Sequence, residues 1–86
     1  EPPYALGRIY YQESRYDDAV TQFAKSIELD PRSYRAYDNL GLAYEGLNDT
    51  AKAIAAYTEY LRLAPTAPDA RVFRDRVEQL TAISSS

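Results

Sequence analysis

The 86-residue sequence contains no cysteine, histidine, methionine or tryptophan, and it has only three glycines. Without cysteine and histidine, the chain lacks disulfides, thiolate and imidazole metal ligands, and the nucleophiles and bases of most covalent catalysts. No apolar run approaches the roughly 20 residues that a membrane-spanning helix needs. These absences predict a protein with no metal site, no cofactor and no membrane span.

Basic residues are also in the minority. Ten lysines and arginines face 13 acids, which gives a net charge of −3 and argues against a nucleic-acid-binding surface. The serines have no histidine or suitable lysine to activate them, so the sequence predicts that the chain is not an enzyme. Because there is no initiator methionine, we expect a segment of a longer protein. A soluble protein is expected, with the cytoplasm slightly favoured.

Aromatic residues, by contrast, are plentiful. Nine tyrosines and two phenylalanines make up 13% of the chain, and several of them recur with a fixed period. Displacing the sequence by 34 residues aligns six identical pairs between residues 1–33 and 35–67: Leu6/Leu40, Gly7/Gly41, Tyr10/Tyr44, Ala19/Ala53, Leu29/Leu63 and Pro31/Pro65. A repeat of this length is typical of helical solenoids.

Within each repeat, the apolar residues follow helical spacing. One stripe runs over residues 37–47 and a second over 53–61, both with the i, i+3, i+4, i+7 pattern. Between them, Asn48 can take a left-handed conformation and Asp49 can cap the following helix. The first repeat has its break at Ser14-Arg15. Each unit is therefore predicted to be an antiparallel helix pair with a tight turn.

Two glycines lie inside the predicted helices. Glycine in a helix interior costs roughly 1 kcal/mol relative to alanine, so Gly7 and Gly41 require a structural reason. We expect them to lie opposite Ala19 and Ala53 and to let the paired helices approach closely.

These residues resemble the tetratricopeptide repeat family, whose pattern is a large aromatic, x2-Leu-Gly-x2-Tyr, Ala-x3-aromatic and Pro. Unit two matches at Tyr37, Leu40, Gly41, Tyr44, Ala53, Tyr57 and Pro65. Unit one matches at Leu6, Gly7, Tyr10, Ala19, Phe23 and Pro31, with Pro3 at the aromatic position. The resemblance covers residues 1–67. It implies an all-α solenoid of antiparallel helix pairs, with five helices in a right-handed superhelical stack.

The predicted organisation is a single domain. Unit one covers residues 1–33, unit two 34–67, a C-terminal solvating helix 68–83, and a tail 84–86. The last helix follows from an offset of 36 residues, which aligns Phe73 with Tyr37. Because no second helix follows it, we expect this helix to cover the exposed face of the second repeat.

The family resemblance implies that the first helix of each pair lines a concave groove for a partner. Such a mixture of arginine, amide and aromatic groups suits an extended peptide or a helix of another protein. The groove residues carried over by position are Tyr4, Arg8, Tyr11, Gln12, Arg35, Asp38, Asn39, Leu42, Glu45 and Arg71. Arg8, Arg35 and Asn39 are expected to hydrogen-bond the partner. The chain is thus predicted to be a scaffold or adaptor module with a protein partner.

One specialised form of the groove is disfavoured. Co-chaperones of the heat-shock proteins hold a C-terminal carboxylate with basic and amide groups at five groove positions. Here those positions carry Tyr4, Arg8, Asn39, Arg71 and Asp75. Tyr4 supplies no charge and Asp75 would repel a carboxylate.

Two other roles remain open from the sequence. The N-terminal face, with Tyr4, Ile9 and Tyr11, could pack on another copy or on preceding repeats, so that the chain serves homo-oligomerisation or repeat stacking without a peptide ligand. Alternatively, the repeats could recruit a substrate to a catalytic domain elsewhere in a longer chain.

Overall fold

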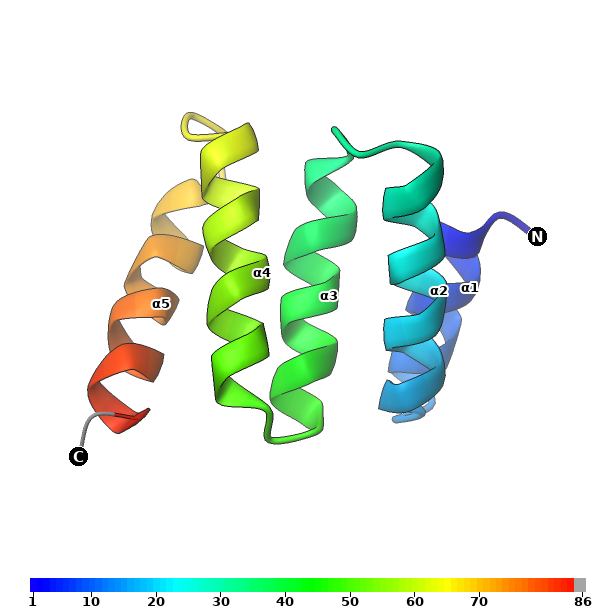
Figure 1. Ribbon diagram of the computed structural model, residues 1–86, viewed down its shortest axis with the longest axis horizontal. Helices are drawn as coiled ribbons and strands as arrows, with labels where there is room; N and C mark the ends of the chain where they lie inside the picture. The colour runs from blue at the N-terminus through cyan, green and yellow to red at the C-terminus, as the bar shows by residue number, and fades with distance from the viewer. Residues whose placement is uncertain (85–86) are drawn as a thin grey trace.

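A computed structural model describes residues 1–84 and shows five α-helices, with no strand among these residues. The helices are α1 (Pro3–Gln12), α2 (Tyr16–Leu29), α3 (Tyr34–Gly46), α4 (Thr50–Leu63) and α5 (Ala70–Ser84). Consecutive helices run in opposite directions, from α1 and α2 at one end to α5 at the other (Figure 1). The predicted all-α helical-repeat fold is confirmed. None of the described helices is long and apolar enough to cross a membrane.

The predicted turns within the two units are confirmed. Asn48 has a φ of 60° and Ser14, its counterpart in unit one, has a φ of 61°. The carboxylate of Asp49 accepts a hydrogen bond of 3.2 Å from the backbone N–H of Lys52 and so caps α4. The side chain of Arg15, at the equivalent position before α2, makes no such capping bond.

The close approach of helices at the glycines is confirmed, but its partner differs from the prediction. A Cβ atom added to Gly7 would lie 2.6 Å from the ring of Phe23. One added to Gly41 would likewise collide with the ring of Tyr57. The predicted partners, the alanines four residues earlier, are buried in the core. The glycines therefore make room for aromatic rings of the second helix.

The core forms two clusters, the first of which spans both units. The first cluster contains Ala19, Phe23 and Ala43, so that α2 joins unit one to unit two. The second cluster contains Tyr57 of α4 and Leu80 of α5. The core of unit two is thus completed by the last helix.

Helix α5 packs its apolar side on α4. The ring of Phe73 lies 5.0 Å from that of Tyr57 and 4.9 Å from that of Tyr60, measured between centroids. Helix α5 spans Ala70–Ser84, whereas the sequence pattern predicted residues 68–83. Of the expected tail, Ser84 closes α5, and residues 85–86 lie outside the described part of the chain.

Candidate functional site

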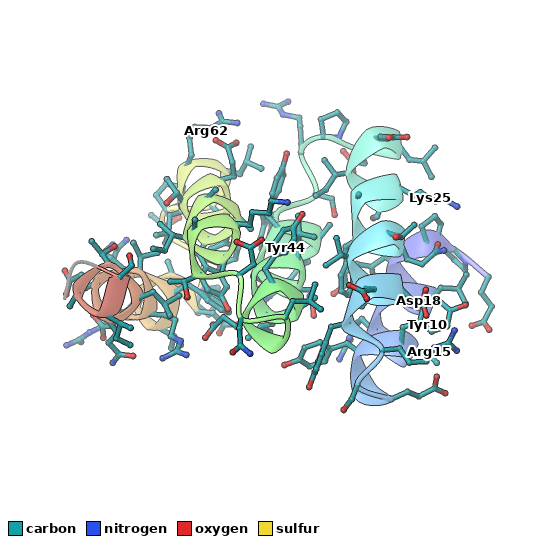
Figure 2. The ribbon with its side chains drawn as sticks, turned by 60° about the horizontal axis from the view of Figure 1, so that its bottom comes forward. Tyr10, Arg15, Asp18, Lys25, Tyr44 and Arg62 are labelled. Carbon is teal, nitrogen blue, oxygen red and sulfur yellow. The ribbon has the colours of Figure 1, made fainter. Side chains whose placement is uncertain are left out.

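The helices form two layers. Helices α1, α3 and α5 lie on one side of the molecule and α2 and α4 on the other (Figures 1 and 2). We call the side formed by the ten groove residues named above, from Tyr4 to Arg71, the first-helix face. All ten come from α1, α3 and α5, the first helix of each unit and the last helix.

A chain of hydrogen bonds crosses the first-helix face. The amide of Asn39 donates to the hydroxyl of Tyr4 at 3.2 Å and to Asp38 Oδ1 at 3.0 Å. The guanidinium of Arg35 donates to Asp38 Oδ2 at 3.2 Å and to Asp69 Oδ2 at 3.0 Å. The chain therefore links α1, α3 and the residue that precedes α5.

Asp38, one of the predicted groove residues, is buried. Its side chain is only 5% exposed, because Arg35 and Asn39 enclose the carboxylate with hydrogen bonds. Burial raises the pKa of Asp38, and the charge of Arg35 opposes that rise. Asp38 thus belongs to the internal support of the face, where its charge is balanced by Arg35.

Glu45 joins three helices. The hydroxyl of Tyr57 on α4 donates a 2.5 Å hydrogen bond to Glu45 Oε2. Arg76 on α5 donates from Nε to the same oxygen at 3.1 Å and from Nη2 to Oε1. Burial alone would raise the pKa of Glu45, but these hydrogen bonds and the charge of Arg76 lower it overall. Its side chain is 18% exposed, so Glu45 mainly fastens α5 to the second unit.

Other predicted residues of the face remain open. Arg8, Gln12 and Arg71 are exposed, and within residues 1–84 their side chains form no hydrogen bond or ion pair. Tyr11 and Leu42 are half-buried. Tyr11 packs edge-on against a neighbouring ring, and Leu42 packs against the core of unit two.

A shallow hollow lies on α1. It is about 340 Å³ and is lined by Tyr4, Ala5, Arg8, Ile9 and Gln12. The hollow places the exposed guanidinium of Arg8 beside apolar side chains.

Sequence reasoning missed the residues that come from the last helix. Asp69 and Arg76 each contact a groove residue of α3, yet neither was predicted to lie at the site. The 36-residue offset gives no signal for them, since it aligns Asp69 with Ser33 and Arg76 with Leu40, neither of which is a groove residue. It does not reveal which way either side chain turns.

A second hollow was also missed. An apolar hollow of about 360 Å³ lies between α3 and α4, with Tyr37, Tyr44 and Ala55 among its lining residues. The repeat alignment gives no clear signal for it, since Ala55 and its counterpart Thr21 are both short. Among the described residues, no three acidic side chains converge to form a metal site.

The comparisons with known proteins give the family. The sequence model of the tetratricopeptide repeat matches residues 4–68, and the chain belongs to this family. It is 35% identical over 74 residues to the tetratricopeptide repeat domain-containing protein PYG7, chloroplastic, of Arabidopsis thaliana, a match covering 86% of the chain and 25% of that relative. It is 44% identical over 52 residues to the Hsp70-Hsp90 organizing protein of Triticum aestivum, covering 60% and 9%.

A further relative is the protein O-mannosyl-transferase tmtc2 of Xenopus laevis, 34% identical over 65 residues, which cover 72% of the chain and 8% of the relative. The chain therefore spans a quarter or less of the length of these relatives. Tetratricopeptide repeats generally mediate protein–protein interaction, and the family is generally not enzymatic.

Proposed function

We propose that this tetratricopeptide repeat domain binds an extended segment or a helix of a partner protein on the first-helix face, between Arg8 of α1 and Arg71 of α5. The proposal rests on one difference among the polar residues of this face: some form contacts within the chain and others do not. Arg35, Asp38 and Glu45 are occupied by contacts within the chain. Arg8 and Arg71 are exposed and have no partner within residues 1–84.

The chemistry of the groups without a partner in the chain indicates what kind of segment would bind. A guanidinium presents a planar set of donors to carboxylates and carbonyl oxygens. Gln12 adds an exposed amide, and Tyr11 and Leu42 add partly buried apolar surface. A segment with acidic side chains beside apolar ones complements this set. Asn39 contributes less than its type suggests, because its amide already donates to Tyr4, Arg35 and Asp38.

Affinity capture from a lysate of the source, analysed by mass spectrometry, tests this proposal. The baits are the unmodified domain, Arg8→Glu/Arg71→Glu, and the control Arg32→Glu, which alters an exposed arginine in the α2–α3 loop. We expect a partner to be captured by the first and the third baits and lost from the second. A partner retained equally by all three would remove Arg8 and Arg71 from the site.

One observation supports self-association through the N-terminal face as a second candidate. Ile9 is 38% exposed, whereas Ala43, at the equivalent place on α3, is fully buried in the cluster that α2 joins. A second copy or another repeat could cover Ile9 in the same way. The substitution Ile9→Glu should then abolish any rise of molecular mass with concentration in sedimentation. An unchanged mass profile would leave the N-terminal face without this role.

A further inference from the structure

The second helices of the two units carry charges of opposite sign at equivalent positions. Helices α2 (Tyr16–Leu29) and α4 (Thr50–Leu63) have the same length and lie 34 residues apart, so residue i of α2 corresponds to i+34 of α4. Counting the residue before each helix, four positions are charged in both units. All four are reversed in sign: Arg15/Asp49, Asp18/Lys52, Lys25/Glu59 and Glu28/Arg62.

Interactions within each helix do not explain the reversal. Cations are favoured near a helix C-terminus and anions near its N-terminus. Helix α4 follows this rule, with Asp49 at its start and Arg62 in its last turn. Helix α2 follows it only in part: Asp17 and Asp18 lie in its first turn, but Arg15 precedes its first residue and Glu28 lies in its last turn. Ion pairs three residues apart could form equally well with the favourable order in both helices.

Most of these charges lie at the surface. Five of the eight residues are exposed, and Asp18, Asp49 and Glu59 are half-buried. Arg15 already contacts Glu13 and Asp18. Lys25 and Glu28 are exposed and form no hydrogen bond or ion pair within the described residues. The side chains of Lys52 and Arg62 are 65% and 64% exposed, although each also contacts an acid three residues earlier. Figure 2 shows Lys25 on α2 and Arg62 on α4 extending away from α3.

Short side chains lie between the charges. Thr21 and Ala24 of α2 are exposed, and so are their counterparts Ala55 and Thr58 of α4. Short residues permit two helices to approach to roughly 8 Å between axes. We call the eight charged residues together with Thr21, Ala24, Ala55 and Thr58 the back face.

We infer that the back face binds a second copy of this chain, with α2 of each copy lying against α4 of the other. The two helices point in the same direction (Figure 1). A two-fold axis parallel to them preserves that direction and brings residue i of one copy opposite residue i+34 of the other. Every reversed position then meets its opposite charge, and each such pair occurs twice in the dimer. The first-helix face stays open, so this role is separate from partner binding.

The association should depend on salt. Exposed ion pairs are individually weak and are screened by salt. The dimer is therefore expected at low ionic strength and high protein concentration, and it should dissociate as salt is added. This behaviour distinguishes it from an apolar contact through Ile9, which salt would not weaken.

Sedimentation equilibrium of charge-reversed variants tests the inference. Lys25→Glu/Glu28→Arg keeps one acid and one base three residues apart on α2 and places the base in the last turn, where a cation is favoured, so we expect folding to be retained. It also places like charges opposite Glu59 and Arg62 of the second copy. We expect its dissociation constant at low salt to rise at least tenfold. Adding Glu59→Lys/Arg62→Glu reverses α4 as well and should restore the original constant.

Three results would overturn the inference. The first is an unmodified chain that stays monomeric at millimolar concentration and low salt. The second is equal association of the unmodified chain and both variants, which would assign the contact to another surface. The third is a failure of the fourfold variant to recover, provided that its circular dichroism spectrum matches that of the unmodified chain.

Discussion

The side-chain amide of Asn39 donates a 3.2 Å hydrogen bond to the hydroxyl of Tyr4, which joins the first helices of the two repeats directly. The same amide donates to the backbone carbonyl of Arg35 at 2.7 Å and to the buried carboxylate of Asp38. The face proposed to bind a partner thus uses several of its polar groups to hold the repeats in register. Recognition is left to the groups at its two ends, Arg8 and Arg71.

Arg35 should prove to be a stabilising residue. The substitution Arg35→Glu would place a third carboxylate beside Asp38 and Asp69, which now share its guanidinium. We expect a loss of about 1–3 kcal/mol in the free energy of unfolding, since Asp38 is buried and would lose its counter-charge. Urea denaturation measures this loss. Arg71→Glu is the control and should change stability by no more than about 0.5 kcal/mol; equal losses in the two variants would contradict the assignment.

Glu45 should control the attachment of α5. The substitution Glu45→Ala leaves the hydroxyl of Tyr57 and the guanidinium of Arg76 without their common acceptor. We expect the free energy of unfolding to fall by about 1–3 kcal/mol. Relative to the unmodified chain, hydrogen exchange should become faster at the amides of α5 than at those of α1. The exposed Glu78 on the same helix provides the control, Glu78→Ala. Uniform exchange rates across the helices of the Glu45 variant would argue against a local fastening.

The contribution of Glu45 should disappear in acid. Its pKa is lowered in the folded state from the ordinary value of 4.5, so its stabilisation is present above that value and is lost as pH falls through the lower folded pKa. The stability difference between the unmodified chain and Glu45→Gln should therefore shrink between pH 7 and pH 3. Urea midpoints at a series of pH values measure it.

Asp38 should behave in the opposite sense. Burial raises its folded pKa above the ordinary value of 3.8, so its contribution is present below that value and is lost as pH rises through the folded pKa. Relative to Asp38→Asn, the unmodified chain should gain stability on acidification. The same trend for the Asp38 and Glu45 variants would show that one of the two environments is misassigned.

Gly41 should not tolerate alanine. The added Cβ would collide with the ring of Tyr57, which is fully buried. We expect Gly41→Ala to destabilise the fold by about 1–3 kcal/mol, although alanine alone favours a helix by about 1 kcal/mol. Thermal unfolding gives the comparison, with the exposed Ala51→Gly reporting the propensity effect by itself. A Gly41→Ala variant that is more stable than the parent would refute the proposed packing.

The local features of the fold could be predicted from the sequence. The turn at Asn48, the cap at Asp49 and the helix periods depend on residues close together in the chain, and each was predicted. The surroundings of Asp38 and Glu45 could not be predicted in the same way. Asp69 lies 34 residues from Arg35, and Arg76 lies 31 residues from Glu45. Their contacts depend on how α5 is rotated against α3 and α4, which the 36-residue offset leaves undetermined.

The sequence also did not show which groove residues form contacts within the chain and which remain exposed. Arg8 and Arg35 are both arginines on first helices, but Arg35 has Asp38 three residues later whereas Arg8 has Tyr11 there. The second acid of Arg35, Asp69, lies 34 residues away and could not be assigned to it from the sequence. The charge reversal between α2 and α4, by contrast, can be read from the sequence once the period is known. The structure adds that five of the eight reversed residues are exposed and the other three half-buried.

Amide chemical-shift mapping tests the central claim most directly. The isotope-labelled domain would be titrated with a peptide from a captured partner, and the shifts would be assigned along the chain. Binding on the first-helix face predicts the largest shifts at α1, α3 and α5 around Arg8, Leu42 and Arg71, with the Arg8→Glu/Arg71→Glu variant showing at least tenfold weaker binding. Shifts concentrated on α2 and α4, with unchanged affinity in that variant, would contradict the account.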